Sequence, residues 1–279
     1  MKTITLPEDL GADSEAVVMA YDYRAKQEST KQQVQLSMNT FSFLLEGSKE
    51  VFSNVKSRAI SNTEFLLMKA GKCLMTERFA GTDNHYRSIL FFFSNEAVLS
   101  FARKYALTLS QAGERKAIQS IPFDRYLRSF ALSLVELDSL SAESRQRVFQ
   151  VKFEELMLYL TDKLGISFLE SLIIDINDYD YHFQEVVEHN KLNRLSLTEL
   201  AFLANMSLST FKRKFENQYH SSPSKWFQEQ RLEYAAMLLR NEQKRASDIY
   251  LDIGYDSLSN FIQAFKARYG QTPKQYQSG

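Results

Sequence analysis

The stretch IGYDSLSNFIQAFKARYGQTPKQY, residues 253–276, decides the fold of the C-terminal part of this chain. Within it, Phe261, Phe265 and Tyr269 recur every four residues. Residues at this spacing lie on one face of an α-helix, so the pattern predicts a helix that packs its aromatic face into a core. The opposite face is polar, and a second occurrence of the pattern indicates what that face does.

The same pattern occurs 50 residues upstream. The matched pairs are Ser207 with Ser257, Leu208 with Leu258, Ser209 with Ser259, Phe211 with Phe261, Phe215 with Phe265, Tyr219 with Tyr269, Pro223 with Pro273, and Trp226 with Tyr276. Because these matches share one register and one helical period, they indicate a duplicated supersecondary unit. Two copies are too few for a solenoid, and a pair of helix-turn-helix units fits better.

Each copy begins with a short apolar helix and continues through a tight turn into a second helix. Asn205 and Gly254 stand in the two turns, where a left-handed backbone costs them little. Ser207 and Ser257 follow, and each is placed to cap the second helix. A short helix, a turn and a capped second helix are the elements that set a recognition helix in the major groove of DNA.

Polar side chains occupy the outward face of each second helix. In the first copy, Arg213 suits a bidentate contact with guanine, Ser209 or Thr210 suits shorter contacts, and Lys214 suits a phosphate. In the second copy, the outward residues are Ser259, Asn260, Ile262 and Gln263, with Lys266 near phosphate. The two amides suit adenine, and Ile262 suits a thymine methyl group.

A long helix is predicted between the two copies, over about residues 226–239. At 1.5 Å per residue it spans roughly 20 Å, which would hold the two units at a fixed distance. One chain would then contact two successive major-groove faces.

The C-terminal hundred residues resemble the DNA-binding domain of the AraC/XylS family of transcription regulators. MSLSTFKRKF (206–215), RLEYAAMLL (231–239) and the stretch 253–276 carry the resemblance. In that family, two helix-turn-helix units joined by a central helix enter adjacent major grooves of one promoter site. The resemblance implies base contacts from Ser209, Lys212, Arg213, Ser259, Asn260 and Gln263, and phosphate contacts are predicted for Thr210, Lys214 and Lys266. Tyr250 stands where the family has a small residue, and the second outward face lacks Arg, so weaker base contacts are expected there.

The first third of the chain indicates strands. Residues 34–38 and 41–45 alternate apolar and polar side chains, which is typical of a half-buried strand. Further short apolar segments follow at 50–55, 63–68, 72–79 and 86–93. Strands at this spacing predict an antiparallel barrel or sandwich. An interior lined by Phe and Leu would hold an apolar ligand or be filled by its own side chains.

Helical patterns replace the strand patterns after Ser94, which is placed as an N-cap. Helices are predicted at about 123–137 and 142–160, followed by a short one after Gly165. The apolar stripe of 142–160 is wide enough to pack on both its own domain and a partner. This region is interpreted as a helical connector that forms a dimer interface.

The N-terminal half carries a broader resemblance. Residues 44–47 and 65–71 resemble the cupin-like barrel that many AraC/XylS members carry as a regulatory domain. Residues 151–160 resemble the connector of a subclass that includes activators of type III secretion, in which the N-terminal part dimerises and a protein can replace the small-molecule effector. The predicted fold is thus α+β, with a cupin-like antiparallel β-barrel at 1–115, a helical connector at 116–178 and an all-α DNA-binding domain at 179–279. The implied partners are promoter DNA, RNA polymerase, a second copy of the chain, and a small-molecule or protein effector.

Composition restricts the alternatives. The 279 residues carry 34 basic and 34 acidic side chains, an ordinary balance for a soluble protein. No apolar run is long enough to span a membrane and no secretory signal is visible, so a cytoplasmic protein is expected. Cys73 is alone, which excludes an intramolecular disulfide and a cysteine metal cluster and predicts a packed apolar residue. The four histidines lack the spacing of a metal site, and no nucleotide-binding or nucleophile motif occurs, so neither a cofactor nor enzyme activity is expected.

Two other hypotheses remain open. A cupin-type enzyme with an accessory helical domain would bind iron, zinc or manganese stoichiometrically, which a metal assay would detect. A protein-interaction module whose helix-turn-helix units have lost DNA binding is the second, and the sparse charge of the second outward face is what supports it.

Overall fold

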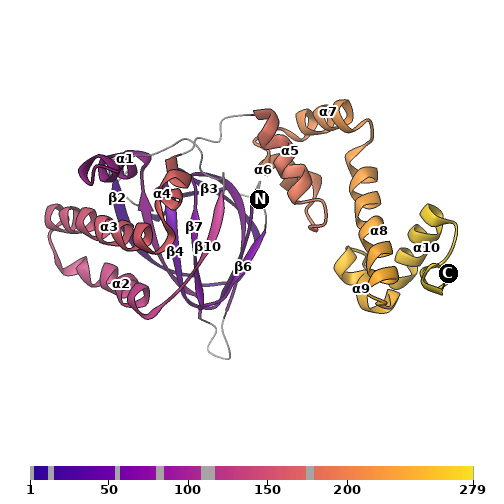
Figure 1. The fold of residues 1–279 in the computed structure, drawn as a ribbon, viewed down its shortest axis with the longest axis horizontal. Coiled ribbons are helices and arrows are strands. Elements are labelled where there is room, and N and C mark those ends of the chain that lie inside the picture. Colours follow the sequence, from indigo (N-terminus) through magenta and orange to yellow (C-terminus); the bar gives the residue numbers. More distant parts are fainter. Residues whose placement is uncertain are drawn as a thin grey trace. The chain divides into compact units, whose positions relative to one another are not determined.

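The computed structural model describes residues 3–11, 16–53, 57–79, 85–107, 117–173 and 179–278. The chain divides into two compact units, 1–182 and 183–279. In Figure 1, indigo to magenta strands and helices form the first unit, and orange to yellow helices form the second. Neither unit contains, among its described helices, one with the length and apolarity needed to cross a lipid bilayer.

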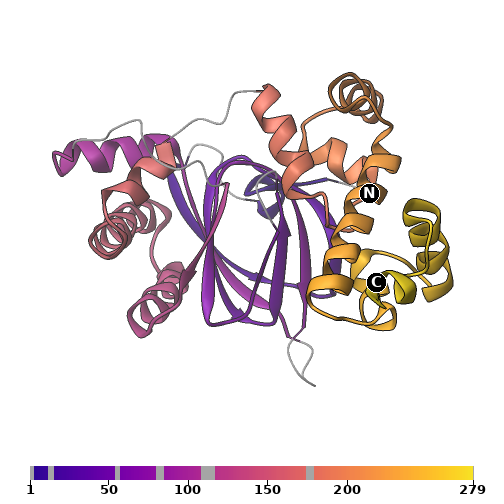
Figure 2. The ribbon, with the colours of Figure 1, turned by 45° about the vertical axis from the view of Figure 1, so that its right-hand side comes forward.

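The described strands of the first unit form two five-stranded sheets. One has the order β1-β3-β8-β5-β6 and the other the order β10-β7-β4-β9-β2. The bounds are β1 (Ile4–Leu6), β2 (Val18–Arg24), β3 (Ser29–Leu36), β4 (Asn39–Glu46), β5 (Ser48–Phe52), β6 (Arg58–Ile60), β7 (Glu64–Met68), β8 (Gly71–Arg78), β9 (Arg87–Phe93) and β10 (Ile118–Pro122), with a short 3-10 helix at Glu8–Leu10. Apart from the parallel pair β1–β3, all neighbouring strands run antiparallel. The predicted α+β class with an antiparallel-sheet region is confirmed, and Figure 2 shows the strands curving around a common interior.

The two faces of the second sheet are buried against different partners. Its inner face packs on the first sheet, and its outer face packs on helices. Phe41, Phe43 and Phe91 lie on the outer face, in the cluster shared with the helices, whereas Leu90 and Phe92 lie inside. The prediction of an interior lined by Phe and Leu was therefore wrong in part. Because strand side chains alternate, a strand covered on both faces is apolar throughout, and sequence alone does not say which set points inward.

The interior of the double sheet also holds charged and polar side chains. Lys49 and Glu77 are buried there and pair at 3.4 Å between Nζ and Oε1. Lys49 Nζ also donates to Ser42 Oγ of the opposite sheet at 3.1 Å, and the Tyr23 hydroxyl donates to Glu77 Oε2 at 3.1 Å. This group therefore links the two sheets through hydrogen bonds as well as packing.

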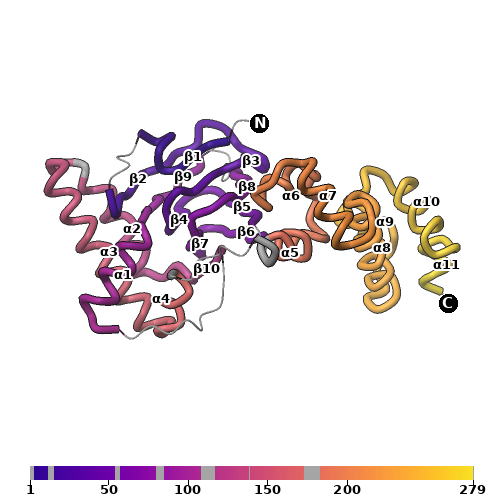
Figure 3. Tube along the Cα trace, turned by 90° about the horizontal axis from the view of Figure 1, so that it is seen from above, coloured from indigo at the N-terminus to yellow at the C-terminus, as the bar shows by residue number. Residues whose placement is uncertain are grey.

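Helices cover the outer face of the second sheet. They are α1 (Asn95–Lys104), α2 (Arg125–Val135), α3 (Ala142–Leu164) and α4 (Ile166–Ile173), with a 3-10 turn at Glu136–Ser139. Ser94 caps α1 as predicted, because its side chain accepts from the amide of Ala97. Figure 3 shows α1, α2 and α3 gathered on one side of the strands. Their inward residues, among them Phe101, Phe130 and Phe153, join the outer-face cluster.

The segment 116–178, interpreted above as a connector, is built into the first unit. It supplies β10, which pairs with β7, and the helices α2 and α3 that pack on the second sheet. The strand β10 was not predicted, because its five residues carry too little alternation to stand out. The role of this segment in dimerisation stays a prediction.

The second unit consists of helices in its described residues. They are α5 (Tyr179–His189), α6 (Leu197–Leu203), α7 (Leu208–Tyr219), α8 (Pro223–Asn241), α9 (Ala246–Ile253), α10 (Leu258–Tyr269) and α11 (Pro273–Ser278). The pairs α6–α7 and α9–α10 are the two predicted copies, and α8 joins them. Asn205 and Gly254 adopt the predicted left-handed backbone, with φ of 61° and 98°.

Candidate nucleic-acid interface

The recognition helix of the first copy is α7. Its inward side chains Phe211 and Phe215 are fully buried. They contact Phe183 of α5, with ring centroids 5.3 and 6.3 Å apart, and Phe215 also meets Phe227 of α8 at 5.6 Å. This aromatic core fixes the rotation of α7, so that Ser209, Lys212 and Arg213 are exposed on the other side.

The first turn of α7 is tied together by hydroxyl groups. Ser207 caps the helix as predicted and accepts from the amide of Thr210 at 3.2 Å. Its Oγ also lies 3.0 Å from Ser209 Oγ and 2.8 Å from Thr210 Oγ1. The two hydroxyls predicted to contact DNA thus share a hydrogen-bond network at the helix cap in the free protein. To contact DNA, each hydroxyl would have to replace its bond to Ser207 with a bond to the DNA.

Lys214 lies on a different side of α7 from Arg213. It is half-buried, and its Nζ lies 4.9 Å from the centroid of the Phe183 ring. A cation over an aromatic face is attracted by the ring quadrupole, so this lysine contributes to packing between α5 and α7. Its predicted phosphate contact stays a prediction.

The recognition helix of the second copy is α10. Phe261 and Phe265 are fully buried in a cluster with α8 and α9, which leaves a polar outward face. The outward residues Ser259, Asn260, Gln263 and Lys266 are exposed, and Ile262 is half-buried. Ser257 caps this helix as predicted, accepting from the amide of Asn260.

The charges of the two outward faces differ. Lys212 and Arg213 project from α7, and neither forms a hydrogen bond or ion pair with any residue that the structure describes. On α10, Arg268 pairs with Glu233 at 3.4 Å, which leaves Lys266 as the cation nearest the amides. The first face therefore offers more positive charge to a polyanion than the second.

The helix α8 holds the two copies together. Its 19 residues correspond to a length of about 28 Å. Phe227 near its start packs on the first copy, and Leu232, Ala235 and Leu239 further along pack on the second. Because both cores share this rod, the separation of α7 and α10 depends on the length of α8.

Sequence reasoning missed one group at this interface. Arg231 lies on α8 between the parts that pack on the two copies, and its Nε is buried with no hydrogen-bond partner among the described residues. The signal in the sequence was a charged residue directly before Leu232 in the apolar pattern of α8.

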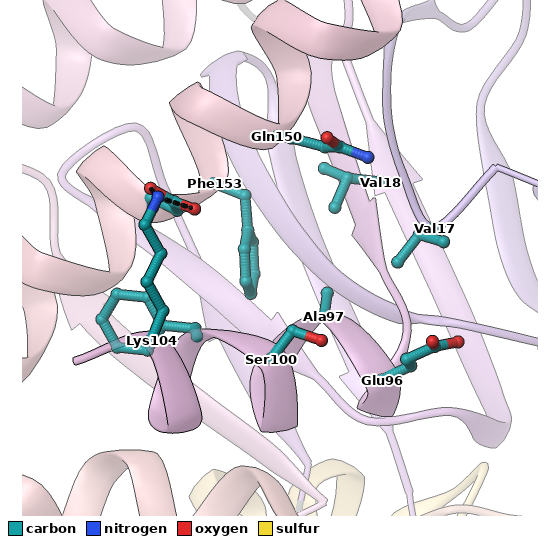
Figure 4. Close-up of a pocket in the computed structure, with 10 residues that line it drawn as sticks. Val17, Val18, Glu96, Ala97, Ser100, Lys104, Gln150 and Phe153 are labelled. Carbon is teal, nitrogen blue, oxygen red and sulfur yellow. Dashed lines mark hydrogen bonds and ion pairs between the residues drawn. The ribbon is translucent and has the colours of Figure 1, made fainter. Parts of the chain in front are cut away.

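A pocket of about 330 Å³ lies in the first unit between α1, α3 and the start of β2. Its lining residues are Val17, Val18, Glu96, Ala97, Ser100, Phe101, Lys104, Gln150, Phe153 and Glu154. At its edge Lys104 Nζ donates to both carboxylate oxygens of Glu154, at 2.8 and 2.6 Å, as the dashed lines in Figure 4 mark. The described residues contain no group of three or more His, Cys, Asp or Glu arranged to hold a metal ion.

Two family models match this chain. Residues 200–279 match a family described as a helix-turn-helix domain, and residues 39–169 match the ExsA N-terminal regulatory domain. Both matched segments are similar to domains of AraC/XylS-family regulators. One matched segment covers the second unit from within α6 onward, and the other covers the first unit from β4 to within α4.

Similar relatives are transcription regulators of this family. The chain is 36% identical over 127 residues to the virulence regulon transcriptional activator VirF of Yersinia enterocolitica, an alignment covering 45% of this chain and 47% of the relative. It is 33% identical over 130 residues to the HTH-type transcriptional regulator ExsA of Pseudomonas aeruginosa, covering 46% and 47%. The chain thus spans about half the length of the curated relatives it matches. The crystal structure of an apo point variant of ToxT from Vibrio cholerae aligns with a TM-score of 0.43 and 15% identity over 96% of this chain and 99% of that one.

Proposed function

We propose that this chain is a sequence-specific DNA-binding transcription regulator of the AraC/XylS type that acts in the cytoplasm. The observation that carries the proposal is the pair of capped helices α7 and α10, each with a buried aromatic face and an exposed polar face, joined by one rigid helix. A helix with these features fits the major groove, where base edges distinguish all four base pairs. Two such helices on one rod would contact two successive major-groove faces.

The two helices make unequal contributions in this proposal. Arg213 contacts guanine through two donors of its guanidinium, with Lys212 and Ser209 beside it. Asn260 and Gln263 contact adenine, with Ser259 beside them. Thr210, Lys214 and Lys266 contact phosphates and set the register without selecting a base. Because the outward face of α7 carries more positive charge, it supplies the larger share of affinity.

Selection from a random DNA library with the full-length protein tests this function. An enriched motif with two half-sites is expected at moderate salt, and no enrichment would refute it. Arg213→Ala should weaken binding to the selected site by roughly 1–3 kcal/mol and relax the preference for one base pair in it. The matched control is Lys225→Ala, an exposed cation in the first turn of α8, which should leave the selected motif unchanged.

Activation is the expected direction of regulation. The relative from Yersinia enterocolitica is described as a transcriptional activator, and activation implies a contact with RNA polymerase. Transcription in vitro from a promoter carrying the selected site, with purified polymerase, should increase when the protein is added. A decrease would assign repression instead.

The outer side of α3 is the proposed dimer surface. Val151 and Leu158 are 64% and 44% exposed, and their spacing of seven residues places them on one side of the helix. Val151→Glu and Leu158→Glu are expected to shift a dimer to a monomer in sedimentation velocity. Leu99→Glu, on α1 and 42% exposed, is the matched control and should leave the sedimentation unchanged. A monomeric wild-type protein would refute this part of the proposal.

An effector would act through the pocket between α1 and α3. Gln150, Phe153 and Glu154 line that pocket from the same helix that presents the proposed dimer surface. A small molecule in the pocket, or a protein covering it, would therefore be coupled to dimerisation. Filling the pocket with Ser100→Trp should change the dimer fraction, and an unchanged fraction with native stability would argue against the coupling.

The alternative that the chain is a cupin-type enzyme is tested by its metal content. The relatives are described as transcription regulators, which fits a protein without catalytic activity. Stoichiometric iron, zinc or manganese in the purified protein would favour a cupin-type enzyme instead.

A further inference from the structure

The two helix-turn-helix copies meet at one arginine of the central helix. Gly254 lies in the turn of the second copy, and Arg194 lies in the loop before α6 of the first. A Cβ atom added to Gly254 would be 3.5 Å from Arg231 Cδ and 3.6 Å from Arg194 Cγ. Arg231 thus lies near the middle of α8, where the loop before the first copy approaches the turn of the second.

Arg231 brings a partly desolvated positive charge to this junction. Burial lowers the pKa of Arg231, and the neighbouring Arg194 lowers it further, while Tyr255 acts in the opposite direction. The described carboxylates form no ion pair with Arg231, and its buried Nε has no hydrogen-bond partner among the described residues. A desolvated guanidinium beside a like charge is unfavourable unless an anion compensates for it.

A tyrosine of the second copy lies near the arginine, and a glutamine of α8 is bonded to that tyrosine. Gln228 lies three residues before Arg231, close to the same side of α8, and its Nε2 donates to the Tyr255 hydroxyl at 3.4 Å. The Tyr255 ring in turn packs on Phe261 of the recognition helix α10, with centroids 5.4 Å apart. The hydroxyl is therefore held beside the arginine by the core of the second copy, and it remains able to donate to an incoming oxygen.

The geometry of DNA supplies an anion at this position. Two successive major grooves on one side of a duplex are separated by the minor groove, which is bordered by the two phosphate backbones. A rod that sets one helix in each groove therefore faces phosphates at its middle. We propose that Arg231, with Arg194 and the Tyr255 hydroxyl, forms a phosphate-binding site that clamps the DNA backbone between the two recognition helices.

This proposal rests on the proposed DNA-binding function and adds a contact to it. Such a contact would not select bases, but it would fix the phase of the two helices on the duplex. It would also stabilise the junction on binding, because the phosphate compensates the repulsion between two neighbouring cations.

The test is the salt dependence of DNA binding by the full-length chain. Arg231→Met keeps much of the length of the side chain and removes the charge. It is expected to weaken binding to the selected site and to unrelated DNA by the same factor, and to reduce the slope of log K against log salt by about 0.9. Arg194→Ala changes an exposed side chain outside any helix, and it should reduce the slope in the same direction if the methionine variant fails to fold. Arg240→Met is the matched control on the same helix, at the end away from the junction, and should leave the slope unchanged.

The outcomes separate this inference from the proposed function. If wild type enriches a motif and Arg213→Ala impairs it, while Arg231→Met and Arg194→Ala keep the wild-type salt slope, the phosphate site is wrong and the function stands. A changed preference for half-site spacing with an unchanged slope would make Arg231 a structural residue of the junction and overturn the phosphate contact. An increase in Tm with inorganic phosphate that Arg231→Met abolishes, combined with an unchanged DNA slope, would assign the site to free phosphate and overturn the DNA contact.

Discussion

Replacing Lys49 with methionine is expected to destabilise the first unit, because the change leaves the Glu77 carboxylate inside the double sheet without its cation. Lys49 and Glu77 are 2% and 6% exposed, so water cannot replace the lost partner. Removing one member of a buried ion pair costs roughly 3–5 kcal/mol. The Tyr23 hydroxyl still donates to Glu77 Oε2 at 3.1 Å, which places the expected loss near the lower end, about 3 kcal/mol.

Urea unfolding of the full-length protein measures this loss in free energy. The double variant Lys49→Met with Glu77→Met should recover most of it, because neither charge then remains buried. Lys104→Met is the control, since its ion pair with Glu154 lies at the surface with the lysine side chain 58% exposed, and it should change the midpoint little. A Lys49→Met protein that unfolds at the wild-type urea concentration would refute the argument that this pair is buried and mutually dependent.

Three further predictions concern single groups. Gly254→Ala should lower Tm, because the alanine would have to adopt the left-handed backbone of Gly254 with its Cβ beside Arg231. The expected cost is about 1–2 kcal/mol, and an unchanged Tm would contradict the left-handed backbone at this position. Burial opposes ionisation of Asp124, but the Leu127 amide and Lys163 outweigh it and lower its pKa to about 2. This carboxylate therefore contributes stability that is fully present above its unfolded pKa of about 3.8 and is lost as the pH falls toward 2. Asp124→Asn should destabilise the protein at pH 7 and progressively less below pH 4. Urea unfolding of both proteins across that pH range would measure the difference. Burial raises the pKa of the Cys73 thiol to about 12, so iodoacetamide at pH 8 should label it only after unfolding, and labelling of the native protein would contradict its burial.

Local sequence signals predicted the elements of both units well. The caps at Ser94, Ser207 and Ser257 were confirmed because a hydroxyl before an apolar helical pattern satisfies a free backbone amide within three residues. The left-handed residues Asn205 and Gly254 were confirmed for a similar reason, since the turn needs a backbone that these residues adopt at low cost. Helix caps and left-handed turn residues depend on interactions within a few residues, so the local sequence is enough to predict them.

Strand assignment was less complete in the first unit. The two alternating segments were found, in β3 and β4, whereas β1, β2, β6 and β10 were missed. Of these, β1, β6 and β10 have three to five residues, too few to establish a period of two. Their pairing depends on neighbours far away in the chain, as with Ile118 of β10 opposite Met68 of β7.

The sequence by itself determined the duplication, the helical spacing and therefore the outward faces of α7 and α10, because a helix fixes which side chains share a face. Only the tertiary structure decided which face of β9 meets the helices, that Lys49 points into the double sheet, and that Arg231 lies beside both Arg194 and Gly254. Each of these depends on contacts between residues far apart in the chain, which no local period encodes. The stretch 253–276 with its upstream copy predicted two polar helix faces. The packing around α8 placed a half-buried arginine, without an ion-pair partner among the described carboxylates, between the two copies.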